Sequence, residues 1–170
     1  MTRLGPAHVG LFLEQQSEEL VRIWRLARTA ARSDVFPGLL DGVLGPFFAR
    51  AGELLAAGGQ PTEVWRGLSG LVRWPLSVAP AEFDAEWALV EEVLSASCES
   101  VNAAPEVSAW LDGAVAVCHA GTARLGERTQ APEGILAAEG ILTAEGILTV
   151  LVFSSVEPPR SLRGEDETVS

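Results

Sequence analysis

Apolar side chains recur at steps of three and four residues along most of the first 126 positions, which is the spacing of one face of an α-helix. The pattern is clearest over residues 80–101, where the glutamates lie on other faces of the same helix. The apolar residues that share one face there are Phe83, Trp87, Val90, Leu94, Cys98 and Val101. The same spacing predicts helices over residues 11–32 and 106–127.

Glycine and proline divide the other apolar segments. Residues 38–59 have a helical composition but contain Gly45-Pro46, which predicts a kink or two short helices because proline lacks an N–H and disfavours helix in the preceding residue. A proline in the first turn opens a further helix over residues 61–74. No segment of residues 8–126 alternates with a period of two. Five helices joined by short loops predict an all-α five-helix bundle over this range.

A tail follows at residues 127–170, and it repeats one hexapeptide three times as EGILAA, EGILTA and EGILTV over residues 133–150. A six-residue step rotates around a helix and builds no single apolar stripe. On a strand the same step places glutamates on the face of the isoleucines. Expansion of a short apolar segment by duplication of its coding DNA is the favoured interpretation. We expect partial burial of this apolar tail and disorder in its last, acidic residues.

The chain gives little support for secretion or membrane insertion. The apolar span 134–156 is long enough to cross a bilayer, but Glu139 and Glu145 interrupt it, each at a cost of about 2–4 kcal/mol. The N-terminus has no continuous apolar segment before Glu14, which argues against a signal peptide. Two cysteines make no disulfide framework. We therefore expect a cytoplasmic protein.

Charge is divided unevenly along the chain, whose formal net charge is −11. Residues 1–75 hold 8 arginines and 7 acidic residues, whereas residues 76–170 hold 4 arginines and 16 acidic residues. An acidic half repels phosphates, so nucleic acid is not expected as a partner. A protein partner or self-association is expected instead.

Few residues carry recognisable chemistry. The chain has no G-x-S-x-G, no phosphate-binding glycine loop and no Glu-x-x-His motif, so we expect no catalytic residue, no metal and no cofactor. Cys118 and His119 are adjacent, and adjacent side chains of a helix diverge by about 100° and do not readily chelate one ion. The carboxylates of the fourth expected helix are interpreted as surface charge. They are Glu82, Asp84, Glu86, Glu91 and Glu92.

Two surfaces remain as candidate binding sites. The first comprises four arginines on one side of the first expected helix, where Glu18 and Arg22 have the spacing of a favourable ion pair. This face is either solvated and self-paired or an anchor for an acidic partner, and its arginines are Arg22, Arg25, Arg28 and Arg32. The second is a small-ligand or haem site in the bundle interior, although buried cysteines more often pack as small hydrophobes. Its residues are Cys98, Trp110, Cys118 and His119.

The order and apolar pattern of the segments EELVRIWRLART, LLDGVLGPFFARAGELLAAG, EFDAEWALVEEVL and WLDGAVAVCHAGTARL resemble the N-terminal helical sensor domain of RsbR-type stressosome proteins and some bacterial histidine kinases. The resemblance covers about residues 10–126. It implies a globin-like fold without haem and a non-enzymatic sensory or regulatory module that acts through protein–protein interaction or dimerisation in bacterial signalling. Glu86-Trp87 match the acidic–aromatic pair of that family, whereas Glu91 stands where the family has arginine.

Overall fold

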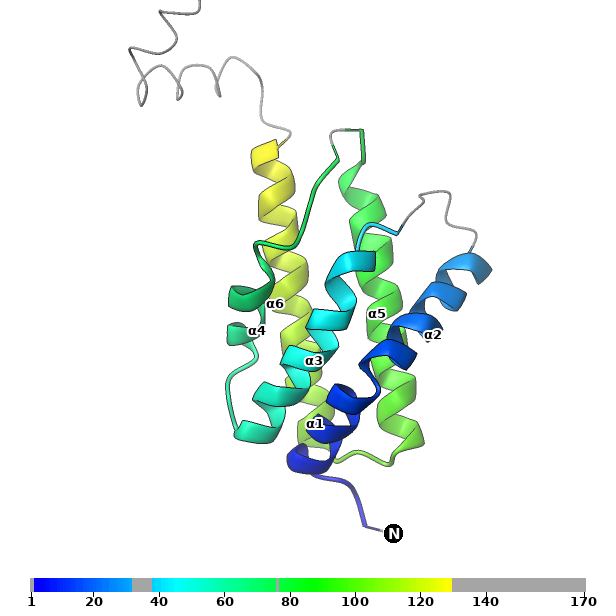
Figure 1. The fold of residues 1–170 in the computed structure, drawn as a ribbon, viewed down its shortest axis with the longest axis vertical. Coiled ribbons are helices and arrows are strands. Elements are labelled where there is room, and N and C mark those ends of the chain that lie inside the picture. Colours follow the sequence, from blue (N-terminus) through cyan, green and yellow to red (C-terminus); the bar gives the residue numbers. More distant parts are fainter. Residues whose placement is uncertain (1, 32–37, 76, 130–170) are drawn as a thin grey trace, which may run out of the picture. The chain divides into compact units, whose positions relative to one another are not determined.

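A computed structural model of the chain describes residues 2–31, 38–75 and 77–129. The chain divides into two units, Met1–Thr129 and Gln130–Ser170, and every described residue belongs to the first. The repeats at 133–150 lie outside the described residues. Six helices form the described part of the first unit (Figure 1): α1 (Pro6–Gln15), α2 (Ser17–Ala30), α3 (Asp41–Ala57), α4 (Thr62–Leu68), α5 (Pro80–Ser100) and α6 (Pro105–Thr129).

The all-α prediction is confirmed, but the described residues form six helices rather than five. The helix expected over residues 11–32 is two helices, because Gln16 between α1 and α2 has non-helical backbone angles (φ −104°, ψ 15°). Val9 and Leu13 of α1 and Leu20 and Trp24 of α2 are all buried, and the two helices have different main partners, α3 for α1 and α3 with α5 for α2.

Of the two alternatives predicted at Pro46, the two short helices are wrong, because α3 is continuous from Asp41 to Ala57. The other alternative, a kink within one helix, stays a prediction. Gly45 precedes the proline, so the clash between the proline ring and a preceding Cβ does not arise. Pro46 is the sixth residue of α3, so its missing N–H removes one helical hydrogen bond, the one to the Gly42 carbonyl. At the other end, Gly58 in the left-handed region (φ 78°) ends the helix as a glycine cap.

The other helices differ from the predicted ones mainly in where they end. α4 stops at Leu68, six residues before the expected end, and an irregular segment with Trp74 continues to α5. The Trp74 ring stacks on Phe83 with a centroid distance of 4.2 Å. α5 and α6 agree with the expected ranges to within two residues at each end.

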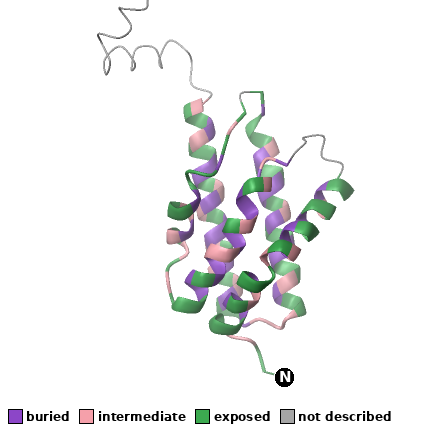
Figure 2. Cartoon of the chain, viewed as in Figure 1, coloured by how far each residue is buried: buried purple, intermediate pink, exposed green. Residues whose placement is uncertain are grey.

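α3 is the central helix of the unit, since it contacts α1, α2, α4 and α6 (Figure 1). α5 and α6 run antiparallel behind it, and the buried residues of all the helices face this shared interior (Figure 2). The core contains Phe47 and Trp87 in edge-to-face contact at 5.6 Å between ring centroids.

α1 and α3 cross at two glycines. A Cβ atom on Gly10 would lie 2.5 Å from the Gly52 carbonyl oxygen, and one on Gly52 would lie 2.4 Å from the Gly10 carbonyl oxygen. The two backbones therefore touch directly, which fixes where the first helix crosses the third.

Candidate functional site

Two charged side chains that the sequence analysis placed on the surface are buried together. Arg28 of α2 is 7% exposed and Glu86 of α5 is 3% exposed, and Arg28 Nε donates a hydrogen bond to Glu86 Oε2 at 3.1 Å. The Arg28 guanidinium also lies 5.3 Å from the ring centroid of Trp24. The expectations that Arg28 belongs to an exposed arginine face and that Glu86 is surface charge are therefore wrong.

Glu86 also accepts hydrogen bonds from the two residues that directly precede α3, the second of which is the N-cap residue of that helix. Its Oε2 atom accepts a hydrogen bond from the Leu39 N–H at 3.1 Å, and its Oε1 atom accepts one from the Leu40 N–H at 3.0 Å. A carboxylate suits this place because the first N–H groups of a helix lack helical partners and carry partial positive charge. Burial raises the pKa of Glu86, against the opposite effect of these hydrogen bonds and of Arg28. The group joins α2, α3 and α5 and has almost no solvent access, so its role is structural.

The sequence carries one sign of this burial. Glu86 lies three residues after Phe83 and four before Val90, so on a helix it falls beside the apolar face of α5. Its partner cannot be read from spacing, because Arg28 is 58 residues away in the chain.

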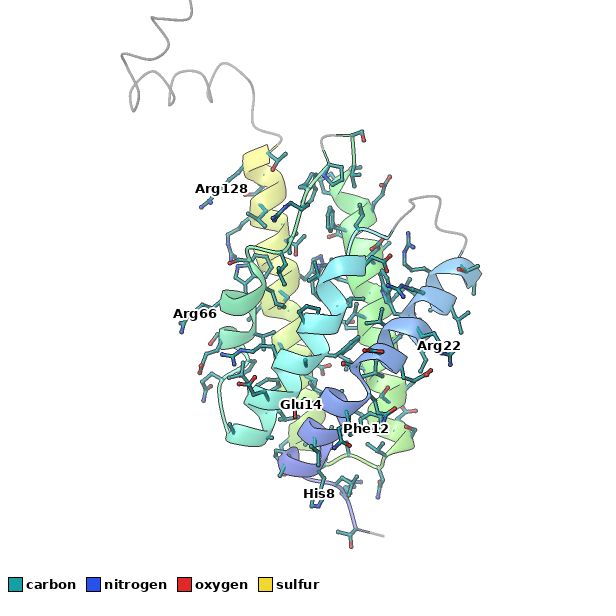
Figure 3. All side chains as sticks on the ribbon, in the orientation of Figure 1. His8, Phe12, Glu14, Arg22, Arg66 and Arg128 are labelled. Atoms are coloured by element: carbon teal, nitrogen blue, oxygen red, sulfur yellow. The ribbon has the colours of Figure 1, made fainter. Side chains whose placement is uncertain are left out.

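The exposed side of α2 carries the remaining described arginines together with apolar residues. Arg22 pairs with Glu19 rather than with the expected Glu18, and it lies on the outer side of α2 (Figure 3). Ile23 is 39% exposed and Leu26 is 58% exposed. We call Glu19, Arg22, Ile23 and Leu26 the α2 face. Because successive helical residues are about 100° apart, Leu26 lies between Arg22 and Ile23 around the helix axis.

A pocket of about 460 Å³ adjoins the α2 face, between α2 and α3. Both charge signs line it, with Glu18, Arg22 and Arg25 from α2 and Asp41 from α3. Arg25 Nε donates to Asp41 Oδ1 at 2.7 Å across its edge. Arg32, the last of the four predicted arginines, lies outside the described residues.

The four residues of the expected ligand site have separate surroundings. Cys118 is fully buried, and burial raises its pKa to about 12, whereas the neighbouring His119 lies at the surface with Nε2 2.6 Å from Asp84 Oδ1. Trp110 Nε1 donates to the Gly59 carbonyl oxygen at 2.9 Å. Cys98 lines a different feature, a surface groove between α5 and α6. The structure does not bring these four side chains together around one ligand.

Among the described residues, no group of three or more His, Cys, Asp or Glu side chains could hold a metal ion. None of the helices in this part of the chain is long and apolar enough to span a bilayer. The chain matches no protein-family model, no curated protein and no solved structure.

Proposed function

We propose that the protein is a non-enzymatic regulatory module that acts by self-association through the α2 face. The observation that carries this proposal is the exposure of Ile23 and Leu26 side by side on one helix, bordered by charged side chains and by the α2–α3 pocket. Exposed apolar residues that are grouped and rimmed by polar groups are typical of interaction surfaces.

The order of charges along α2 favours a second copy of the chain as the occupant. Glu18 and Glu19 stand in its first turn, and Arg22 and Arg25 follow in the next turns. Two α2 helices packed antiparallel across a two-fold axis bring the acidic turn of each copy toward the arginines of the other. The pairs Arg22–Glu19 and Arg25–Asp41 are exposed and can exchange partners at little cost.

The regulatory part of the proposal rests on the resemblance to helical sensor domains of bacterial signalling proteins. A globin-like arrangement of the helices and action through dimerisation are the parts of that resemblance that the proposal adopts. The proposal also keeps the cytoplasmic location expected from the sequence. Occupation of the bundle interior by a small ligand or haem is the competing function, but the separation of Cys118 from the surface-exposed His119 ring gives it less support.

Sedimentation equilibrium over a range of protein concentrations tests the proposal. We expect the wild-type chain to form dimers and the Leu26→Glu variant to remain monomeric, because two buried glutamates would face each other at the interface. The control is Leu71→Glu, since Leu71 is also exposed but lies after α4. Dimers that persist in Leu26→Glu, or a wild-type chain that stays monomeric at every concentration, would contradict self-association through this face.

A further inference from the structure

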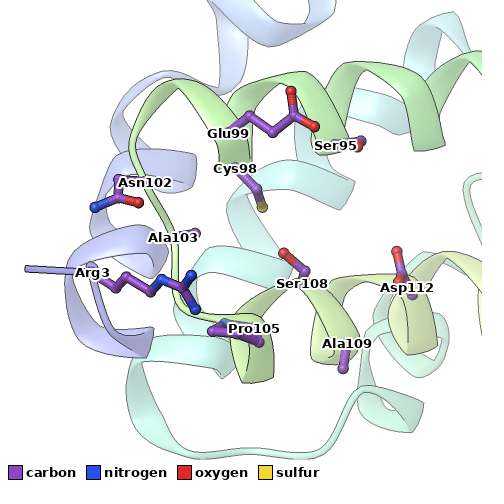
Figure 4. A pocket seen from close by; sticks show the side chains of 10 residues that line it. All are labelled: Arg3, Ser95, Cys98, Glu99, Asn102, Ala103, Pro105, Ser108, Ala109 and Asp112. Carbon is purple, nitrogen blue, oxygen red and sulfur yellow. The ribbon is translucent and has the colours of Figure 1, made fainter.

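The first residues of the chain are fastened to the turn between α5 and α6. The Leu4 N–H donates to the Asn102 carbonyl oxygen at 2.9 Å, and the Ala104 N–H donates to the Leu4 carbonyl oxygen at 2.9 Å. Asn102 Nδ2 adds a hydrogen bond to the Thr2 carbonyl oxygen at 3.1 Å. These bonds flank Arg3 on both sides, so its backbone is held at the end of the α5–α6 groove (Figure 4).

Asn102 makes this turn possible through its backbone. Its φ of 55° is in the left-handed region, which asparagine tolerates better than most residues. The Asn102 N–H donates to the Glu99 carbonyl oxygen and the Ala103 N–H donates to the Cys98 carbonyl oxygen, which is the hydrogen-bond pattern of a Schellman cap. The left-handed residue therefore ends α5 and turns its own carbonyl oxygen toward Leu4.

The groove has a volume of about 580 Å³, within the usual range for small-molecule sites. Small side chains leave this space open, among them Ser95 and Cys98 from α5 and Ser108 and Ala109 from α6. Burial raises the pKa of the Cys98 thiol, against the opposite effect of the nearby Ser108 hydroxyl. The floor of the groove is therefore uncharged near neutral pH and offers hydroxyl and thiol groups.

Charged side chains of opposite sign stand at the two ends of the groove. Arg3 lies at the end nearest the turn, and Asp112 lies at the far end, with Cys98 and Ser108 between them (Figure 4). Glu99 adds a second carboxylate on the α5 side. Within the described ranges none of these three side chains has an ion-pair partner.

We propose that this groove binds a small zwitterion, an amino acid or short peptide with free termini, whose carboxylate contacts Arg3 and whose ammonium group contacts Asp112. A simple anion would face repulsion from Asp112 and Glu99, and a simple cation would face repulsion from Arg3. Only a ligand with separated charges of both signs complements both ends. The site shares no residue with the α2 face, so this inference stands apart from the proposed function.

Titration of the full chain with alanine, dialanine and trialanine, followed by amide chemical shifts in 15N-labelled protein, tests the site. We expect saturable shifts at Ser108 and Asp112 for one or more of these probes. The probe that binds most tightly reports the span between the two charges and distinguishes a free amino acid from a peptide. The same peptides with an acetylated N-terminus and an amidated C-terminus should give no shifts at these positions.

Two substitutions then separate the two charge contacts. Arg3→Gln and Asp112→Asn should each raise the dissociation constant by about tenfold, the loss typical of one charge-assisted contact. The matched controls are Arg66→Gln on α4 and Glu127→Gln near the end of α6, both exposed and outside the groove, and they should leave binding unchanged. The proposal would be overturned by the absence of shifts for all three free probes or by equal binding of the blocked peptides. It would also be overturned if Arg3→Gln or Asp112→Asn left the dissociation constant unchanged.

Discussion

Two arginines that lie three residues apart on α2 differ in how far they are buried. Arg28 and Arg25 differ by only about 60° around the helix axis, yet Arg28 is enclosed against Trp24 and Glu86 while Arg25 reaches Asp41 at the surface. Removing one member of a buried ion pair leaves a charge without compensation in a poorly solvated place, whereas an exposed pair contributes little.

We therefore expect Arg28→Met to lower the free energy of unfolding by about 3–5 kcal/mol. The matched change Arg25→Met should alter it by less than about 1 kcal/mol, because its pair with Asp41 is solvated. Urea denaturation followed by circular dichroism measures both values. Similar decreases in the free energy of unfolding for the two variants would show that burial does not determine how much the Arg28–Glu86 pair contributes to stability.

The sequence predicts the arginines as a group but not the different surroundings of each. Their spacing of three or four residues is visible, whereas the rotation of α2 about its axis is set by contacts with α3 and α5, which are distant in the chain. The same limit applies to the ligand hypothesis. Cys118 and His119 are neighbours in sequence, but helical geometry turns one into the core and the other to the surface.

At the scale of elements, apolar periodicity located the long helices well and their interruptions poorly. α5 and α6 bury one continuous side each, so the pattern predicts them to within two residues. The break at Gln16 has no glycine or proline to mark it in the sequence, and it separates α1, which packs mainly on α3, from α2, which packs on both α3 and α5. Pro46 predicted a possible division into two helices. The helix continues through it, because Gly45 has no Cβ atom to clash with the proline ring.

Glycines of α6 give a prediction about how that helix meets α4. A Cβ on Gly121 would lie 2.2 Å from the Trp65 ring, whereas the nearest atom to a Cβ on Gly113 is Pro61 Cγ at 3.4 Å. We expect Gly121→Ala to destabilise the protein by about 1–3 kcal/mol, because the added methyl group overlaps the Trp65 indole, which must then move away from α6. Gly113→Ala should instead stabilise it by about 0.5–1 kcal/mol through lower backbone entropy in the unfolded chain.

Thermal and urea unfolding measure the change in the free energy of unfolding for each variant. If Trp65 packs closely on α6, the two changes have opposite signs, negative for Gly121→Ala and positive for Gly113→Ala. Stabilisation by both alanines would mean that helix propensity alone governs these positions. Both substitutions add a methyl group to α6, so the gain in helix propensity is the same for the two variants. The comparison therefore isolates the contact between residue 121 and the Trp65 ring.

At the scale of the whole molecule, the described part of the first unit holds one connected hydrophobic core. Its buried apolar side chains lie between Val9 and Cys118, and they come from all six helices, from the segment after α4, and from Leu40 and Ala104, which directly precede α3 and α6. The sequence predicts this all-α class from composition and periodicity. It does not predict that α3 occupies the centre, because that depends on the glycine crossing with α1 and on the hydrogen bonds that Glu86 accepts from the residues directly before α3.

A chain that ends at Thr129 should therefore fold. We expect its thermal unfolding to be cooperative and its free energy of unfolding to lie within about 1 kcal/mol of the full chain, which corresponds to a few degrees in melting temperature. A control chain that ends at Ala116 removes Cys118 and Thr122, both fully buried, and should not fold. Loss of cooperative unfolding in the chain that ends at Thr129 would assign residues 130–170 a part in the core.

Sedimentation equilibrium of the same truncated chain tests whether the α2 face is sufficient for dimers. A chain that folds but no longer forms dimers would place the self-association surface in residues 130–170.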